Sequence, residues 1–183
     1  MIYLWITVGV VIVLIVWIIT TFNSLIQKRN RVKNAWSDIE VQLKRRHDLI
    51  PNLIEVVKSY KEYEASVLEN IVKARTNAIN QSSISGKAQA ENILSEALKS
   101  LFAVAENYPQ LKASENFQKL QDQLSGIEND IQSARRYYNA AVREFNNAVQ
   151  VFPSNIIAKI FGFKQYEFFG AEEGEKEVVK VSF

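Results

Sequence analysis

The sequence predicts an all-α protein: an N-terminal transmembrane helix continuous with an elongated antiparallel four-helix (partly three-helix) bundle, and a short extended C-terminal tail. Three observations predict this class. Residues 2–22 form an apolar run without a charged side chain. The apolar residues that follow recur at spacings of three and four, the period of one helix face. Six glycines and three prolines are few for 183 residues, so the helices should have few breaks.

The apolar run predicts a membrane anchor over residues 1–24. Roughly 20 apolar residues at about 1.5 Å rise per residue span the ~30 Å hydrocarbon core of a bilayer. Tyr3 and Trp5 near one end and Trp17 near the other are typical of residues at the two membrane interfaces. A cleaved signal peptide is the alternative, but it needs a basic leading region, a shorter apolar core and a small-residue cleavage site, which this run lacks.

Four basic residues follow the anchor, namely Lys28, Arg29, Arg31 and Lys33. The positive-inside rule then places the amino terminus outside and the rest of the chain in the cytoplasm. The same cations lie where acidic lipid headgroups would attract them, which makes them candidate headgroup ligands. The alternative is that they set topology alone.

The overall charge argues against nucleic acid as a partner. The chain has 22 basic and 20 acidic residues, and the basic ones are scattered among the acids. It has no cysteine, which excludes disulfides, thiol catalysis and thiolate metal sites.

The helical bundle is predicted over residues 25–153. Pro51 should end or bend the first helix, because proline lacks an amide hydrogen and disfavours helix in its predecessor, and Asp48 could cap the next one. Glu64 and Arg75 fall on the apolar stripe of the second helix and are interpreted as partners across helices. The most regular apolar seam belongs to the fourth helix and predicts coiled-coil-like packing. The expected helices are residues 25–48, 49–79, 87–107 and 112–152.

The tail, residues 154–183, should begin with a short helix and continue as an aromatic, strand-like segment. Its last residues alternate in the manner of a strand, and a lone strand needs a pairing partner. A second copy of the chain is the candidate partner. The proposed self-association residues are Phe161, Phe163, Phe168, Phe169, Val179, Val181 and Phe183.

The sequence indicates no catalytic or metal site. His47 is the one histidine, and no glutamate stands three residues before it, so the Glu-x-x-His pattern of di-iron bundles is missing. Phosphate-loop, dinucleotide and nucleophile-elbow motifs are absent too. Glu55, Glu62 and Glu69 recur every seven residues, a spacing typical of a solvated face, and a carboxylate-only ion site is the weaker alternative. We predict a non-enzymatic protein without a cofactor.

Three stretches resemble the LemA family of bacteria. They are FNSLIQKRNRVKNAWSDIEVQLKRRHDLIPNLIEVVKSY (residues 22–60), IENDIQSARRYYNAAVREFN (residues 127–146), and FP…IAKIFGF…FFGAEEGEKEVVKVSF at the end. The resemblance implies a single-pass protein of the bacterial inner membrane with a cytoplasmic helical bundle and no established enzymatic activity. Some family members are associated with magnetosome membranes. Gly170 and Val179 depart from the family pattern, which favours an acidic residue and a proline there.

The residues shared with the family around the first helix are interpreted in two ways. They could form a functional surface, or they could be the cap, bend and polar contacts that set the angle between the first two helices. They are Trp36, Asp38, Gln42, Arg45, Arg46, Asp48, Pro51 and Asn52.

Two functions are predicted. The first is a membrane-anchored scaffold, a homo-oligomer that contacts membrane lipids and organises or shapes the cytoplasmic side of a bacterial membrane. The alternative is a monomeric, membrane-tethered adaptor that binds a cytoplasmic protein, for example in signalling. Adjacent apolar pairs on the second helix, such as Ile71 with Val72, would supply the adaptor's binding surface.

Overall fold

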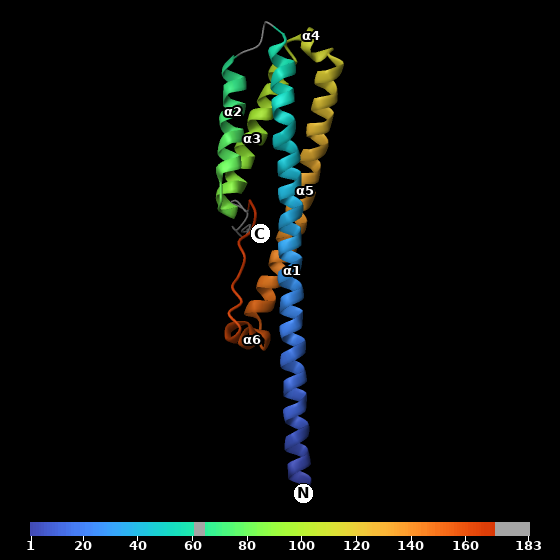
Figure 1. Cartoon of the computed structure of the whole chain (residues 1–183), viewed down its shortest axis with the longest axis vertical. Coiled ribbons are helices and arrows are strands. Elements are labelled where there is room, and N and C mark those ends of the chain that lie inside the picture. Colours follow the sequence, from blue (N-terminus) through green and yellow to red (C-terminus); the bar gives the residue numbers. More distant parts are fainter. Residues whose placement is uncertain (61–64, 171–183) are drawn as a thin grey trace, which may run out of the picture. The chain divides into compact units, whose positions relative to one another are not determined.

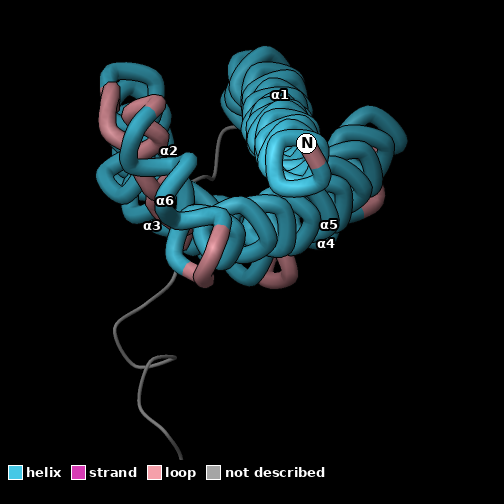
Figure 2. Tube along the Cα trace, turned by 90° about the horizontal axis from the view of Figure 1, so that it is seen from below, coloured by secondary structure: helices cyan, strands magenta, loops and turns pink. Residues whose placement is uncertain are grey.

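The structure is a computed structural model that describes residues 1–60 and 65–170 (Figure 1). The described residues form helices and connecting turns, and no strand occurs among them (Figure 2). The predicted all-α class is therefore confirmed. The helices are α1 (Ile2–Lys58), α2 (Ala65–Asn80), α3 (Ile84–Ala105), α4 (Pro109–Lys112), α5 (Glu115–Gln150) and α6 (Ser154–Ile160).

The chain divides into two compact units. The first consists of Met1–Ser37 and Tyr137–Glu167, and the second of Asp38–Arg136 and Phe168–Phe183. Helices α1 and α5 each contribute one part to each unit. The predicted bounds of the anchor, bundle and tail remain predictions.

The second unit is built around one apolar core to which α1, α2, α3, α4 and α5 all contribute. This shared core is the arrangement expected of a helical bundle. Helices α2 and α3 lie side by side in it (Figure 1). Among its most deeply buried members are Ile50, Leu53, Ile71, Leu94 and Phe117.

The prediction that the first helix ends at Pro51 is wrong. Helix α1 continues through Pro51 to Lys58, so the first two helices do not meet at residues 48 and 49. Proline in a helix leaves the carbonyl four residues earlier without its usual donor. That carbonyl belongs to His47, and Arg75 Nε of α2 donates to it over 2.9 Å. The structure thus replaces the missing helical bond, and it confirms Arg75 as a partner across helices; Glu64 lies outside the described residues.

Smaller differences concern the ends of the later helices. Helix α3 begins at Ile84, where the Ser83 side chain accepts a hydrogen bond from the Gly86 amide over 3.1 Å. The predicted fourth helix, residues 112–152, corresponds to α5, which begins at Glu115 and ends at Gln150, and the short helix α4 precedes it. Phe152 lies within the predicted bounds of the fourth helix but is 75% exposed, because it follows the end of α5 and no longer shares its periodicity.

In the first unit, α1 packs against α5, α6 and the segment that follows. Buried apolar residues come from each helix, including Val32 of α1, Phe145 of α5 and Ile157 of α6. The apolar start of α1 is exposed, and by length and composition α1 is the one described helix that could cross a membrane.

Candidate functional site: a buried ion-pair cluster and a docked C-terminal segment

A buried ion-pair cluster lies inside the second unit. The Arg46 side chain of α1 is 1% exposed and forms an ion pair with Glu91 of α3. Its Nη1 donates to Glu128 Oε2 of α5 over 2.6 Å and to Ser95 Oγ over 2.7 Å. One guanidinium therefore connects three helices.

His47 completes this cluster. Its Nε2 lies 3.1 Å from Glu91 Oε1, and the His47 side chain is 12% exposed. Burial raises the pKa of Glu91, but the His47 hydrogen bond and the Arg46 charge outweigh burial and hold that pKa below its ordinary value. Glu91 is thus an anion in the core, stabilised by two partners on α1.

The chemistry of the cluster is that of a structural polar core. Its charged groups form ion pairs with one another, although the buried Arg46 Nε and Glu91 Oε1 have no hydrogen-bond partner. The described residues contain no group of three or more histidine, cysteine or carboxylate side chains placed to hold a metal ion. Sequence reasoning missed Glu91, Ser95 and Glu128. For Glu91 a signal existed, because it precedes Leu94 and Leu98 at spacings of three and four on the buried stripe of α3.

The eight family-motif residues differ in exposure. Arg46 points into the core, whereas Asp38, Asp48, Pro51 and Asn52 are exposed. Asp48 caps no helix. It lies within α1 and pairs with Lys44 over 2.7 Å, and that hydrogen bond lowers its pKa.

Three motif residues make specific contacts. The Trp36 ring packs on Tyr138, with ring centroids 5.5 Å apart. Arg45 donates to Gln42 Oε1 over 2.9 Å, and its Nη1 lies 3.8 Å from Asp130 Oδ2. Both motif interpretations remain predictions, although Arg46 serves helix packing.

The four candidate lipid ligands are engaged to different degrees. Lys28 and Arg31 both form ion pairs with Glu144 of α5, Arg31 over 2.8 Å. The Lys28 hydrogen bond is the main cause that lowers the pKa of Glu144. The Arg29 guanidinium lies over the Phe163 ring, 5.4 Å from its centroid, and Lys33 is exposed. Headgroup binding remains a prediction, and Glu144 would compete with lipid for Lys28 and Arg31.

The segment after α6 is docked on α5 by three hydrogen bonds. Asn146 donates from Nδ2 to the Tyr166 carbonyl and accepts from the Tyr166 amide, each over 2.9 Å. The Tyr138 hydroxyl donates to the Glu167 carbonyl over 2.9 Å. Burial, followed by the charges of Tyr166 and Glu167, raises the pKa of Tyr138 to about 12. Nothing in the sequence pattern pairs Asn146 with Tyr166.

Several residues predicted for self-association contact their own chain. The rings of Phe161 and Phe163 lie 4.7 and 5.9 Å from that of Phe22. Phe169 is buried beneath the Arg135 guanidinium, which lies 5.3 Å from its ring centroid, and Phe168 is half-buried. Val179, Val181 and Phe183 lie outside the described residues. The self-association tail remains a prediction. Because Phe161, Phe163 and Phe169 contact their own chain, fewer of the predicted residues are available for contacts with a second copy.

Gly170 has a physical explanation. Its φ is +70°, a conformation that side chains disfavour, and a Cβ there would lie 2.1 Å from Arg135 Nη2. A glycine therefore suits this position better than the acidic residue of the family pattern.

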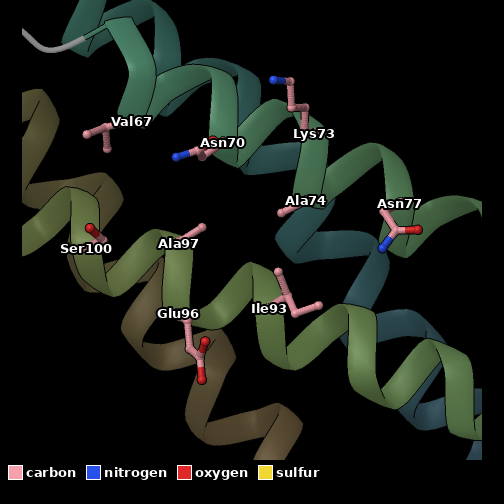
Figure 3. A pocket seen from close by; sticks show the side chains of 9 residues that line it. All are labelled: Val67, Asn70, Lys73, Ala74, Asn77, Ile93, Glu96, Ala97 and Ser100. Carbon is pink, nitrogen blue, oxygen red and sulfur yellow. The ribbon is translucent and has the colours of Figure 1, made fainter.

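An open groove of about 480 Å³ lies between α2 and α3. Ala74 of α2 points toward Ile93 and Ala97 of α3 across the groove, whereas Lys73 and Glu96 point away (Figure 3). Ile93 is 46% exposed in this groove.

These features define an α-helical protein whose described residues include one candidate membrane span and a helical core that contains a buried ion-pair cluster. The chain belongs to the LemA family, whose family model matches residues 35–183. It is 29% identical over 165 residues to Protein LemA of Metamycoplasma hominis, covering 87% of this chain and 74% of that protein. It is 26% identical over 185 residues to Magnetosome protein MamQ 1 and MamQ 2 of Paramagnetospirillum magneticum, covering 87% of this chain and 68% of each relative.

Proposed function

We propose that this protein is a non-enzymatic scaffold of the bacterial inner membrane that self-associates and organises the cytoplasmic side of the bilayer. The observation that carries the proposal is that α1 combines an exposed apolar run with a part that packs into a helical core. The helix that contains the exposed apolar run also supplies Ile50, Leu53 and Val57 to the core of the second unit. The proposed membrane span and part of the helical core therefore belong to the same helix.

The charge distribution supports the orientation of this scaffold. Lys28, Arg29, Arg31 and Lys33 directly follow the apolar run, which favours an outside amino terminus and cytoplasmic units. The relatives named as magnetosome proteins support a role at membranes. Many weak contacts between anchored copies would combine into a stable lattice through multivalency.

Residues 171–183 are the part of the predicted tail on which to test self-association. A chain truncated after Gly170 keeps the Asn146 and Tyr138 hydrogen bonds to residues 166 and 167. We expect gently extracted full-length protein to form particles of many copies by mass measurement and electron microscopy, and the truncated chain to form smaller ones. Particles of unchanged mass after truncation would contradict the tail's role. A monomeric full-length protein would contradict the scaffold.

The α2/α3 groove favours a second candidate function, a monomeric adaptor for a cytoplasmic protein. Ile93 offers an exposed apolar contact within a groove that Asn70, Asn77 and Ser100 also line as hydrogen-bonding groups. Apolar contacts combined with a few polar groups are usual in protein-binding sites.

One cross-linking experiment separates the two candidates. A photo-activated cross-linking residue is placed at Ile93 in the groove, and a matched control at Val41, which is 55% exposed on α1 and does not line the groove. Cross-links between two copies of this chain that form from Ile93 and not from Val41 would favour the scaffold. Cross-links to one other protein that form from Ile93 and not from Val41 would favour the adaptor.

A further inference from the structure

Helix α6 packs against α1 at the point where the apolar run of α1 ends. Its Ile157 and Ala158 are 3% and 1% exposed and pack on Leu25 of α1. Trp17 and Phe22, from the last part of the apolar run, pack against the same cluster. All these residues belong to the first unit. Helix α6 therefore lies at the level where the apolar span ends.

Helix α6 and the turn before it also carry a group of large apolar side chains that are exposed. Within residues 151–161, five are exposed by 47–75%, although the same short stretch also buries Ile157 and Ala158. Single exposed apolar residues are ordinary, but a group of this size marks a contact surface. The patch consists of Val151, Phe152, Ile156, Ile160 and Phe161.

Two observations identify what covers this patch. The Phe161 ring is in contact with that of Phe22, so the patch adjoins the apolar span, which lipid surrounds in a membrane. Residues 145–166 also contain no acidic residue, whereas Lys159 and Lys164 are present. Apolar side chains flanked by lysine are the pattern of helices that lie in the membrane interface.

We propose that α6 and the preceding turn insert into the leaflet through which α1 leaves the membrane. Phe152, Ile156 and Ile160 reach the boundary between headgroups and acyl chains, and Lys159 extends toward the phosphates. Each chain then has two membrane contacts, a span and a wedge in one leaflet. This inference rests on the membrane span of the proposed function and does not require self-association.

The absence of cysteine from the chain permits a direct depth measurement. Single variants Phe152→Cys, Ile156→Cys and Ile160→Cys of the full chain are labelled with an environment-sensitive fluorophore. They are reconstituted in vesicles of phosphatidylcholine and phosphatidylglycerol. Val16→Cys, within the span, is the membrane control, and Val72→Cys, which is 48% exposed in the second unit, is the aqueous control.

We expect labels at the three patch positions to be quenched by nitroxides on the lipid and protected from aqueous iodide. The depth should be about 5–10 Å into the interface, shallower than Val16. The Val72 label should behave in the opposite way.

Two results would overturn the inference. One is iodide quenching at Ile156 and Ile160 equal to that at Val72, with Val16 still in lipid, which places the patch in water. The other is protection from iodide that is lost when the protein-to-lipid ratio of the vesicles is lowered. That result would mean that a second copy of the chain, and not lipid, covers the patch. Iodide access at Val16 would instead contradict the span, and with it the proposed function.

Discussion

Two clusters of the same chemistry occupy opposite environments in this protein. In the second unit Arg46 and Glu91 are 1% and 4% exposed by side chain. In the first unit Lys28 and Arg31 share Glu144, with side-chain exposures of 25%, 52% and 43%. Both clusters join α1 to another helix through a carboxylate. They differ in whether water can replace a lost partner.

That difference decides what each cluster contributes. Removing one partner of a buried pair leaves an unpaired charge in the core and typically costs about 3–5 kcal/mol. An exposed pair contributes about 0–1 kcal/mol, because water and salt compete for its charges. The buried cluster should therefore fix how α1, α3 and α5 pack, whereas loss of the Glu144 partner should cost the exposed cluster little stability.

The largest expected effect follows from Glu91→Ala. The variant leaves Arg46 buried with Glu128 as its remaining carboxylate partner, and we expect the free energy of unfolding of the second unit to fall by about 3–5 kcal/mol. Hydrogen exchange of the α3 amides under native conditions measures that change.

The matched control is the double variant Arg46→Met, Glu91→Leu. It removes both charges and fills the space with apolar side chains, so most of the lost stability should return. Equal losses in the single and double variants would mean that volume, and not charge, matters at this position.

The second effect concerns Tyr138 at alkaline pH. Its pKa is about 12 in the folded protein against an ordinary value of 10.0. The Tyr138 hydroxyl stays protonated to a higher pH in the folded state than in the unfolded state. The stability that this difference contributes is complete below pH 10 and is lost as the pH rises toward 12. The loss should reach about 2–3 kcal/mol for a shift of this size.

Exchange protection of the α5 amides against pH measures this loss, with Tyr138→Phe as the reference. The phenylalanine variant also loses the hydrogen bond to the Glu167 carbonyl, about 1 kcal/mol at neutral pH, but should lack the decline between pH 10 and 12. An identical alkaline decline in both proteins would assign it to other groups.

The third effect tests the docked segment. Asn146→Ala removes both hydrogen bonds to the Tyr166 backbone, each worth about 0.5–1.5 kcal/mol. We expect faster proteolysis after Lys164, measured by mass spectrometry of trypsin-treated protein. Asn147→Ala, at an exposed position one residue on, is the control and should behave as the unaltered protein. Equal cleavage in all three would show that aromatic packing alone holds the segment.

The fold was largely predictable because apolar periodicity reports burial directly. The seam of α5, from Phe117 through Ile131 to Phe145, is buried as its spacing predicts. Pro51 was misjudged because the local rule considers the lost backbone bond alone, and the compensating donor, Arg75, lies 24 residues away.

The site was less predictable because its contacts are specific and distant in sequence. Arg46 was recognised as a motif residue, but its burial depends on Glu91 and Glu128. These two residues lie 45 and 82 positions further along the chain, on other helices. Asn146 shows the same limit. Its periodicity indicates a helix, whereas its partner is the backbone of a segment without regular structure.

The smallest expected effect belongs to Glu144→Gln in the exposed cluster. Because Lys28 and Arg31 remain in contact with water, we expect the free energy of unfolding of the first unit to change by less than about 1 kcal/mol. The difference from the unaltered protein should shrink further in about 0.5 M salt, where the Debye length is only a few Å. The uncharged side chain would also leave both cations free for lipid, so binding to vesicles that contain phosphatidylglycerol should strengthen. A loss of several kcal/mol that persists in salt would instead place this cluster in the same energetic class as Arg46 and Glu91, and the contrast drawn from exposure would fail.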